Sequence, residues 1–446
     1  MKAGRLDGAG LITVYAVFLF AIPSRLTVGA LGGAGSPAMV IGLGFAVLWV
    51  AFQIQREPSP TTGANPVRRA GVGLLVAFAI SYVVAMMRAI DPAEVKAADL
   101  GLVVLFSWLG TLLFAHDCVP SVDRLRVVCD RLVLGAGGVA AVGVLQWLTG
   151  QTLIDKIRIP GLSANSPFFQ LTVREGFNRP TGTALHPIEF GAVLTMLIPL
   201  AIARALASPD EHRGMVRRWG PVVVLVMGVS LSISRSAILG LVVGVVVFAF
   251  VLSRRVAATL AAGGLVFVVL LFLTVPGLLG TMLGLFTNAG DDSSVASRTS
   301  SYGLALEFFA RSPLFGRGFG TFLPSYRIFD DQYLLSLVDV GLVGLVAIVG
   351  LFAAAGVVAR RSRRLFVGGD EKLMAQGLFA GVSVGASGLL IYDGFSFPMG
   401  AGLLFLLIGL SGCAYRLARA SAAAQRQERA GPALYTTGPN KVDHSG

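Results

Sequence analysis

The residues of this chain that could do chemistry are gathered in two polar stretches, 150–185 and 286–332, and in the residues beside them. Arginines recur in and between these stretches, and the candidate substrate-binding residues among them are Arg179, Arg235, Arg298 and Arg317. A guanidinium group makes paired hydrogen bonds to phosphate and keeps its charge when it is partly buried. The arrangement therefore predicts a binding site for an anionic ligand.

Carboxylates follow in the sequence FDDQYLLSLVDVG, at the start of an expected helix. Asp331 is the candidate catalytic residue, because an ionised carboxylate can act as a general base toward a sugar hydroxyl. Gln332 beside it is a candidate substrate-binding residue. The alternative for the acids is a helix cap that complements the helix dipole, and this is the favoured role for Asp330. Asp339 lies in the apolar part of the helix and needs a polar partner.

A second group of polar residues opens another expected helix, with the sequence HPIEFG. His186 is a candidate catalytic residue, although a histidine at this position more often has a structural hydrogen-bonding role. Glu189 is a candidate substrate-binding residue, because a carboxylate inside a membrane needs a partner.

Three glycines, Gly316, Gly318 and Gly320, surround Arg317. Glycine permits positive φ and a close backbone approach, which an oxygen-rich ligand could use. The alternative is a tight loop packed against the membrane surface, and a glycine repeat without a preceding strand does not decide between the two.

The elements that must position these residues are transmembrane helices. The chain has 446 residues, of which 55% are hydrophobic and 13% charged, and a helix needs roughly 20 apolar residues to cross about 30 Å of hydrocarbon. The expected fold class is therefore an all-α polytopic integral membrane protein with about 12 transmembrane helices. The predicted spans are 9–25, 38–54, 71–89, 100–116, 132–149, 186–204, 219–233, 236–253, 257–285, 333–359, 374–392 and 395–415.

The apolar region 219–253 is too long for one span, and its flanking charges predict two. Arginines precede it at Arg217 and Arg218 and follow it at Arg254. If both flanks lie on the same side of the membrane, the chain must turn back around 230–236. Arg235 then lies on the opposite side, with the two polar stretches.

Lys and Arg exceed Asp and Glu by 36 to 24, giving a net charge of +12. Their distribution between the expected loops predicts cytoplasmic termini and a cytoplasmic (plasma) membrane location. The basic excess points to membrane lipid headgroups as partners and not to nucleic acid. The expected domains are a transmembrane domain at 1–419 and a disordered cytoplasmic tail at 420–446. The three cysteines lack metal-ligand spacing, so no metal site is expected.

Three sequence signatures resemble the O-antigen ligase and polymerase family, which are polytopic bacterial glycosyltransferases of the GT-C kind. They are RPTGTALHPIEFG from Arg179, SISRSAILG from Ser232, and the block RT…SPLFGRGFGTF…DDQYLLSLVDVGLVGL from Arg298. The resemblance covers roughly 150–350, and the last block is the most specific.

The resemblance implies transfer of a glycan from an undecaprenyl-pyrophosphate carrier to an acceptor hydroxyl at the outer face of the membrane, without cofactor or metal. Arg179, Arg235 and Arg298 stand at the positions thought to hold the pyrophosphate. Asp331 and Gln332 replace the histidine and asparagine usual in ligases, so a polymerase is favoured over a ligase that acts on a lipid or protein acceptor. Other polysaccharide-assembly proteins are expected partners.

Two other classes of function are compatible with the pattern. A transporter of an anionic solute would use the same basic vestibule, but transporters concentrate polar groups near the bilayer midplane and this chain places them near the helix ends. A noncatalytic scaffold of a cell-envelope complex would use the arginines to bind headgroups or a partner protein.

Overall fold

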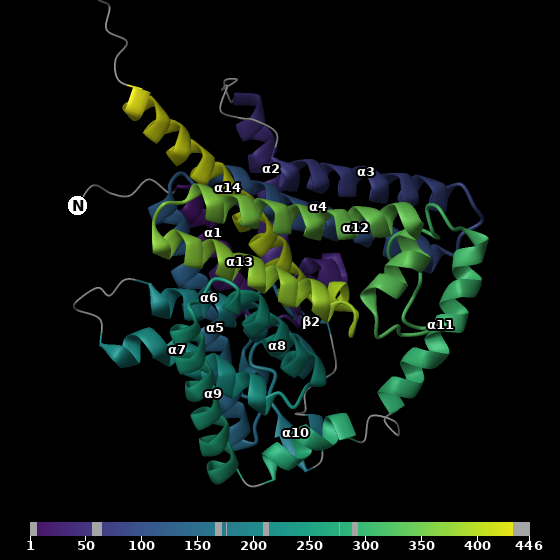
Figure 1. Ribbon diagram of the computed structural model, residues 1–446. Helices are drawn as coiled ribbons and strands as arrows, with labels where there is room; N and C mark the ends of the chain where they lie inside the picture. The colour runs from purple at the N-terminus through teal and green to yellow at the C-terminus, as the bar shows by residue number, and fades with distance from the viewer. Residues whose placement is uncertain are drawn as a thin grey trace, which may run out of the picture.

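The helices of this protein form one bundle, as a computed structural model shows (Figure 1). The structure describes residues 7–55, 65–165, 172–174, 176–207, 214–275, 277–287 and 293–430. The helices are α1 (Gly8–Ala21), α2 (Pro37–Gln55), α3 (Pro66–Met86), α4 (Pro92–Cys118), α5 (Val122–Thr149), α6 (Pro187–Leu206), α7 (Met215–Leu231), α8 (Arg235–Ala249), α9 (Arg254–Thr274), α10 (Leu278–Thr287), α11 (Ser293–Arg311), α12 (Gln332–Leu365), α13 (Gly369–Gly388) and α14 (Pro398–Ala430).

The predicted all-α membrane architecture is confirmed, and each predicted span coincides with helix. The region 257–285 divides into α9 and α10. In the described ranges, 8 helices are long and apolar enough to cross a membrane, and α1 and α8 are shorter apolar helices. A total of about twelve crossings stays a prediction. The strands are short: β1 (Leu26–Thr27) pairs with β2 (Ser163–Ala164), and β3 (Thr172–Arg174) pairs with β4 (Phe177–Arg179).

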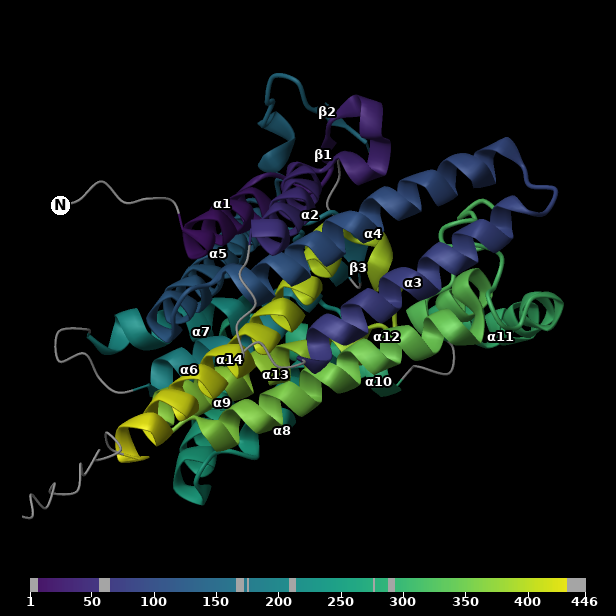
Figure 2. The same cartoon turned by 90° about the horizontal axis from the view of Figure 1, so that it is seen from above.

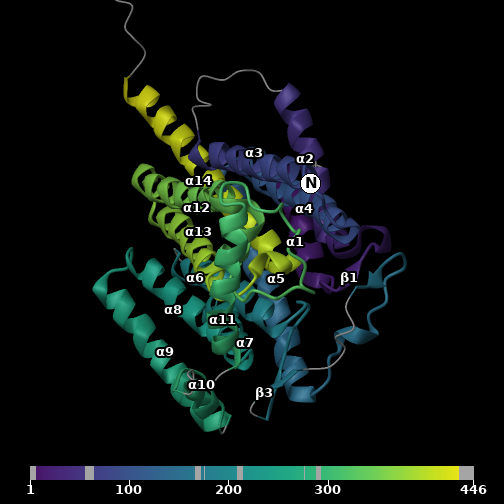
Figure 3. The same cartoon turned by 90° about the vertical axis from the view of Figure 1, so that its right-hand side faces the viewer.

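Helices α6 and α14 lie at the centre of the bundle, and α9 lies at its edge. The most apolar window of α14 is 94% buried and that of α6 is 83% buried, against 6% for α9. Figure 3 shows α9 and α10 standing away from the other helices. The exposed apolar face of α9 therefore suits contact with lipid.

The starts of α4, α6, α12 and α14 meet at one end of the bundle, which we call the site end. Figure 2 shows α3, α4, α12 and α14 running side by side toward it. The turn predicted around 230–236 also lies there, because α7 ends at Leu231 and α8 begins at Arg235. Ile233 in this turn is fully buried and has a φ of 45°, which is unusual for a β-branched residue.

The stretch 286–332 contains a helix that the sequence-based prediction treated as loop. Helix α11 crosses in front of the site end in Figure 3. Its inner face carries Ser301 and Ala305, both buried, and Phe308 packs in the same small apolar cluster. These residues follow the 3.6-residue period, but the helix begins with SSVASRTSS, and this polar first half hid it from a search for apolar spans.

The second correction concerns the end of the chain. Helix α14 continues to Ala430, so the predicted domain boundary at 419/420 falls inside a helix. The predicted disordered tail lies outside the described residues from 431 onward.

Helix α12 is broken at Gly341, where φ is 63°. The break frees backbone groups, and the loop after α11 satisfies them. The amides of Leu342 and Val343 donate to the carbonyls of Pro313 and Leu314, at 2.9 and 3.1 Å. In lipid such groups must find protein partners, so the break and the loop require each other.

We expect Gly341→Ala to destabilise the protein by about 1–3 kcal/mol, because alanine resists positive φ. Its Cβ would also lie 2.5 Å from the Leu314 backbone. Thermal unfolding in detergent measures the change. Gly350→Ala is the matched control, since this glycine of α12 has open space around it. An unchanged melting temperature for Gly341→Ala would show that the helix break does not require glycine at position 341.

Candidate active site

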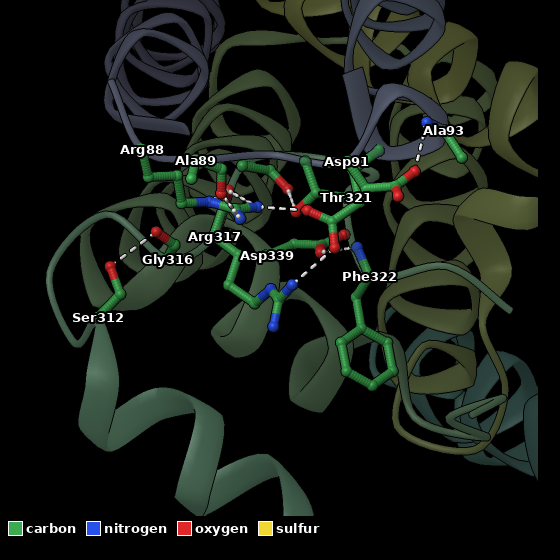
Figure 4. A network of polar contacts seen from close by, with 12 residues as sticks. Arg88, Ala89, Asp91, Ala93, Ser312, Gly316, Arg317, Thr321, Phe322 and Asp339 are labelled. Carbon is green, nitrogen blue, oxygen red and sulfur yellow. Dashed lines mark hydrogen bonds and ion pairs between the residues drawn. The ribbon is translucent and has the colours of Figure 1, made fainter. Parts of the chain in front are cut away.

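The glycine-rich loop is bound to Asp339 of α12, which is 3% exposed (Figure 4). One carboxylate oxygen accepts from the Phe322 amide and the other from the Gly320 amide, each at 3.0 Å. The Gly318 amide donates to the Asp339 carbonyl at 2.7 Å. The polar partner expected for Asp339 is therefore the loop backbone. Because these amides are used within the protein, the tight-loop alternative describes the glycines.

Arg317 lies in an ion-pair network at the α3–α4 end of the loop. Its Nη2 is 2.7 Å from Glu94 Oε1, and its guanidinium lies 4.9 Å from the Phe308 ring centre. Arg88 binds the other oxygen of Glu94 at 2.6 Å, and the Tyr326 hydroxyl donates to Glu94 at 3.0 Å. These contacts give Arg317 a role in holding the loop on α4, apart from the other predicted binding residues.

Arg179 and Arg235 gather at the α7–α8 turn. Arg179 ends β4, is 8% exposed, and donates from Nε to the Ser232 carbonyl at 2.9 Å. Arg235 is the first residue of α8 and lies three positions after Ser232 in the chain. Two arginines from separate segments thus lie at the α7–α8 turn, at the site end. The side chain of Arg298, in the first half of α11, lies outside the described residues.

His186 caps the start of α6 with its ring. Nδ1 accepts a hydrogen bond from the Ile188 amide at 3.2 Å, so the neutral ring carries its proton on Nε2. Burial, together with the nearby charge of Arg179, lowers the pKa of His186 to about 4. The ring is therefore neutral at physiological pH, which suits a hydrogen-bond donor better than a general base.

Glu189 joins α6 to the start of α14. Its carboxylate is fully buried and accepts from the amides of Leu185 and Met399, both at 2.7 Å, and of Gly400 at 3.1 Å. A carboxylate held by three amides within the protein is suited to positioning the two helix starts. It is poorly placed for the direct substrate contact that the sequence suggested.

Asp331 caps the start of α12, and Gln332, the first residue of α12, fixes the loop between α13 and α14. The Asp331 carboxylate caps the helix by accepting from the Leu334 amide at 3.0 Å. The Gln332 amide donates to the Leu389 carbonyl at 2.8 Å, and its side-chain oxygen accepts from the Phe395 amide at 2.9 Å. Gln332 is 3% exposed. It therefore clamps residues 389–395, and we assign it a positioning role.

The α13–α14 loop connects the two halves of the site. The Phe397 ring lies between those of His186 and Tyr392, with centres 6.1 and 5.8 Å away. Asp393 lies within the stretch that Gln332 clamps. The pKa of Asp393 is raised to about 6. Burial is the main cause, the charge of Asp330 contributes, and the hydrogen bond with the Ser396 hydroxyl partly opposes the rise.

Sequence reasoning treated Tyr392-Asp393-Gly394 as a short turn and assigned it no function. The available signal was an acid between aromatic residues at the same end of the bundle as the arginines. Only the clamp from Gln332 places this acid beside the start of α12.

Comparison with known proteins finds one family match. Residues 220–349 match the O-antigen ligase family. This match supports assignment of the chain to the O-antigen ligase and polymerase family, and it supports a function in membrane glycan assembly. The matched region includes Arg235, Asp331 and Gln332, whereas Arg179 and His186 precede it. A search of curated proteins finds no match to the chain.

Glu189→Gln tests the positioning role. We expect a loss of about 1–3 kcal/mol in stability, because the new amide group would face backbone N–H donors and leave one unsatisfied. Thermal unfolding in detergent measures it. Glu307→Gln is the control, since Glu307 forms an exposed pair with Arg311 that contributes little. Equal melting temperatures for the two variants would contradict the assignment.

Proposed function

We propose that this family member is a glycosyltransferase of cell-surface polysaccharide assembly that uses an undecaprenyl-pyrophosphate-linked glycan as donor. The observation that carries the proposal is the convergence of Arg179 and Arg235 at the α7–α8 turn, at the same end of the bundle as His186 and Asp331. Two fixed cations at a membrane surface suit a pyrophosphate. The family membership supports the reaction class.

The reaction places developing negative charge on the leaving group. The acceptor hydroxyl loses its proton to a base, its oxygen bonds to the anomeric carbon, and the bond from that carbon to the pyrophosphate oxygen breaks. Guanidinium groups stabilise the charge on the departing pyrophosphate and provide this stabilisation without a metal ion. The Nε2–H of His186 is available to donate to an oxygen of either substrate.

Two carboxylates are candidates for the base. Asp331 stands where the resemblance places the histidine of ligases, but its carboxylate also caps α12. Asp393 has the more suitable pKa, because a base with a pKa near the working pH transfers protons more effectively than an ordinary carboxylate. The substitution of a ligase histidine by Asp331 favours polymerisation of repeat units over transfer to a lipid or protein acceptor.

The proposed location is the cytoplasmic membrane of a bacterium, with the site end facing outward and both termini in the cytoplasm. The opposite end of α12 carries four arginines within five residues, 360–364. That distribution agrees with the tendency of basic residues to stay on the cytoplasmic side. Membrane lipid and other polysaccharide-assembly proteins are the proposed partners.

We expect Arg179→Gln and Arg235→Gln to abolish long glycan chains in cells that lack the wild-type gene. Single lipid-linked units should accumulate, because the leaving group loses its stabilisation, while membrane abundance stays unchanged. The size profile of surface glycans measures this. Arg311→Gln, at an exposed ion pair on α11, is the matched control. Full-length but unattached chains would indicate a ligase. An unchanged profile would contradict the glycosyltransferase and favour a transporter.

The pH dependence of the rate tests Asp393. A base must be ionised to accept a proton, so the wild-type rate should fall as pH decreases through about 6. Asp330→Asn removes a charge that raises the pKa of Asp393, so the inflection should move to lower pH. Asp393→Asn should lose activity, and Asp393→Glu should regain part of it. An inflection unmoved by Asp330→Asn would exclude Asp393 as the titrating group.

A further inference from the structure

A groove of about 520 Å³ lies between α1 and α5, on the side of the bundle away from α12. Its walls are almost entirely apolar, and they include Ala16, Phe20, Gly138 and Val142. Val17, which also lines it, is 56% exposed, so the groove opens sideways. In a membrane that opening faces hydrocarbon, and the volume is typical of a site for a small molecule or a single chain.

The two ends of the groove differ. Toward the end opposite the site, Arg131 donates to Thr13 at 2.7 Å, and both residues line the groove. At the site end the groove is lined by Leu153, Ile154 and Ile157. Hydrocarbon walls that are closed by a polar pair at the end opposite the site suit a long aliphatic chain that lies along the helices.

The wall at the site end is built by a strained and buried connection. Leu153 has a φ of 56°, a left-handed conformation that costs energy in a residue with a side chain. It precedes a 3₁₀ turn, Ile154–Lys156. Arg25, which is 6% exposed, holds this turn through the Asp155 carboxylate and through the Ile154 carbonyl, at 2.8 Å from the latter. Strained residues persist where the surrounding structure fixes them, and they cluster at ligand-binding segments.

The same end of the groove reaches the candidate active site. Thr183 lines the groove, donates to the Phe20 carbonyl at 2.6 Å, and lies between Arg179 and His186 in the chain. Gln146 accepts from the Gly182 amide at 2.8 Å and fixes this segment on α5. A chain in the groove would therefore bring its head group to the segment that carries both site residues.

Two cationic side chains lie next to the site end of the groove. Lys156 and Arg158 are exposed on either side of the groove-lining Ile157. A lipid whose chain fills the groove would meet these two positive charges at its head. The ligand that complements these positive charges is a lipid with an anionic phosphate group.

We propose that the α1–α5 groove binds the polyprenyl chain of the phosphate-linked carrier and so presents the carrier's head group to Arg179 and His186. The proposal rests on the function proposed above. An ordinary phospholipid would fit the apolar walls equally well. Contact between the groove and the segment 179–186 favours the substrate, because a bulk lipid has no need to reach that segment.

Two neighbouring glycines of α5 make a matched test. Gly138 lines the groove and Gly137 does not, and neither has any atom within 4 Å of the position a Cβ would take. Gly138→Phe should fill the groove without disturbing the fold, and Gly137→Phe should add the same ring facing elsewhere. Val142→Trp is a second groove-filling variant. Melting temperatures in detergent establish that all three fold.

The probe is an undecaprenyl phosphate that carries a photoreactive diazirine in its chain, applied to the purified full-length protein. We expect labelling of α1 and α5 that unlabelled undecaprenyl phosphate competes away and phosphatidylglycerol does not. Gly138→Phe should raise the concentration for half-maximal labelling at least about tenfold, the effect of losing roughly two buried methylene contacts. Gly137→Phe should leave it unchanged.

Equal competition by phosphatidylglycerol would overturn the proposal, because the groove would then hold ordinary membrane lipid. Equal labelling of folded Gly138→Phe and Gly137→Phe would overturn it as well. The glycan size profile separates this result from the function. If the protein is labelled specifically but its loss leaves surface glycans unchanged, lipid binding in the groove stands and the glycosyltransferase function is refuted. If a folded Gly138→Phe variant makes normal glycans, only the proposed role of the groove is refuted.

Discussion

Hydrocarbon gives an open peptide group no hydrogen-bond partner, so every irregular segment of this chain needs an internal one. Four buried polar side chains supply those partners at the site end. Asp339 binds the glycine-rich loop, Glu189 binds the start of α14, Gln332 binds the α13–α14 loop, and Gln146 binds the segment after β4. Each accepts hydrogen bonds from backbone amides, so side chains of the helices fix the segments around them.

This arrangement gives the site its chemistry. Fixed loops hold Arg179 at the α7–α8 turn and Asp393 beside the start of α12, and burial then sets their electrostatics. The same burial lowers the pKa of His186 and raises that of Asp393, because it disfavours the charged form of each. The neutral imidazole becomes a donor, and the carboxylate becomes a stronger base than an exposed aspartate.

Residues predicted for one purpose divide into two groups in the structure. Arg179 and Arg235 lie at the α7–α8 turn, at the site end. Arg317, Gln332 and Glu189 are polar as well, but they bind other parts of the protein and hold them in place. The sequence could not distinguish ligand-binding residues from positioning residues, because the same polar side chains can bind a ligand or a backbone amide.

The sequence by itself determined the apolar helices and the turn at 230–236. Hydrophobic length and flanking charge are local properties of the chain, and they govern how a segment inserts into a membrane. The sequence also predicted that Arg179 and Arg235 lie at the same end of the bundle. Tertiary structure alone decided what those residues contact. The break at Gly341, the clamp on Asp393, the amphipathic α11 and the α1–α5 groove all arise from contacts between segments far apart in the chain, and no local pattern specifies such contacts.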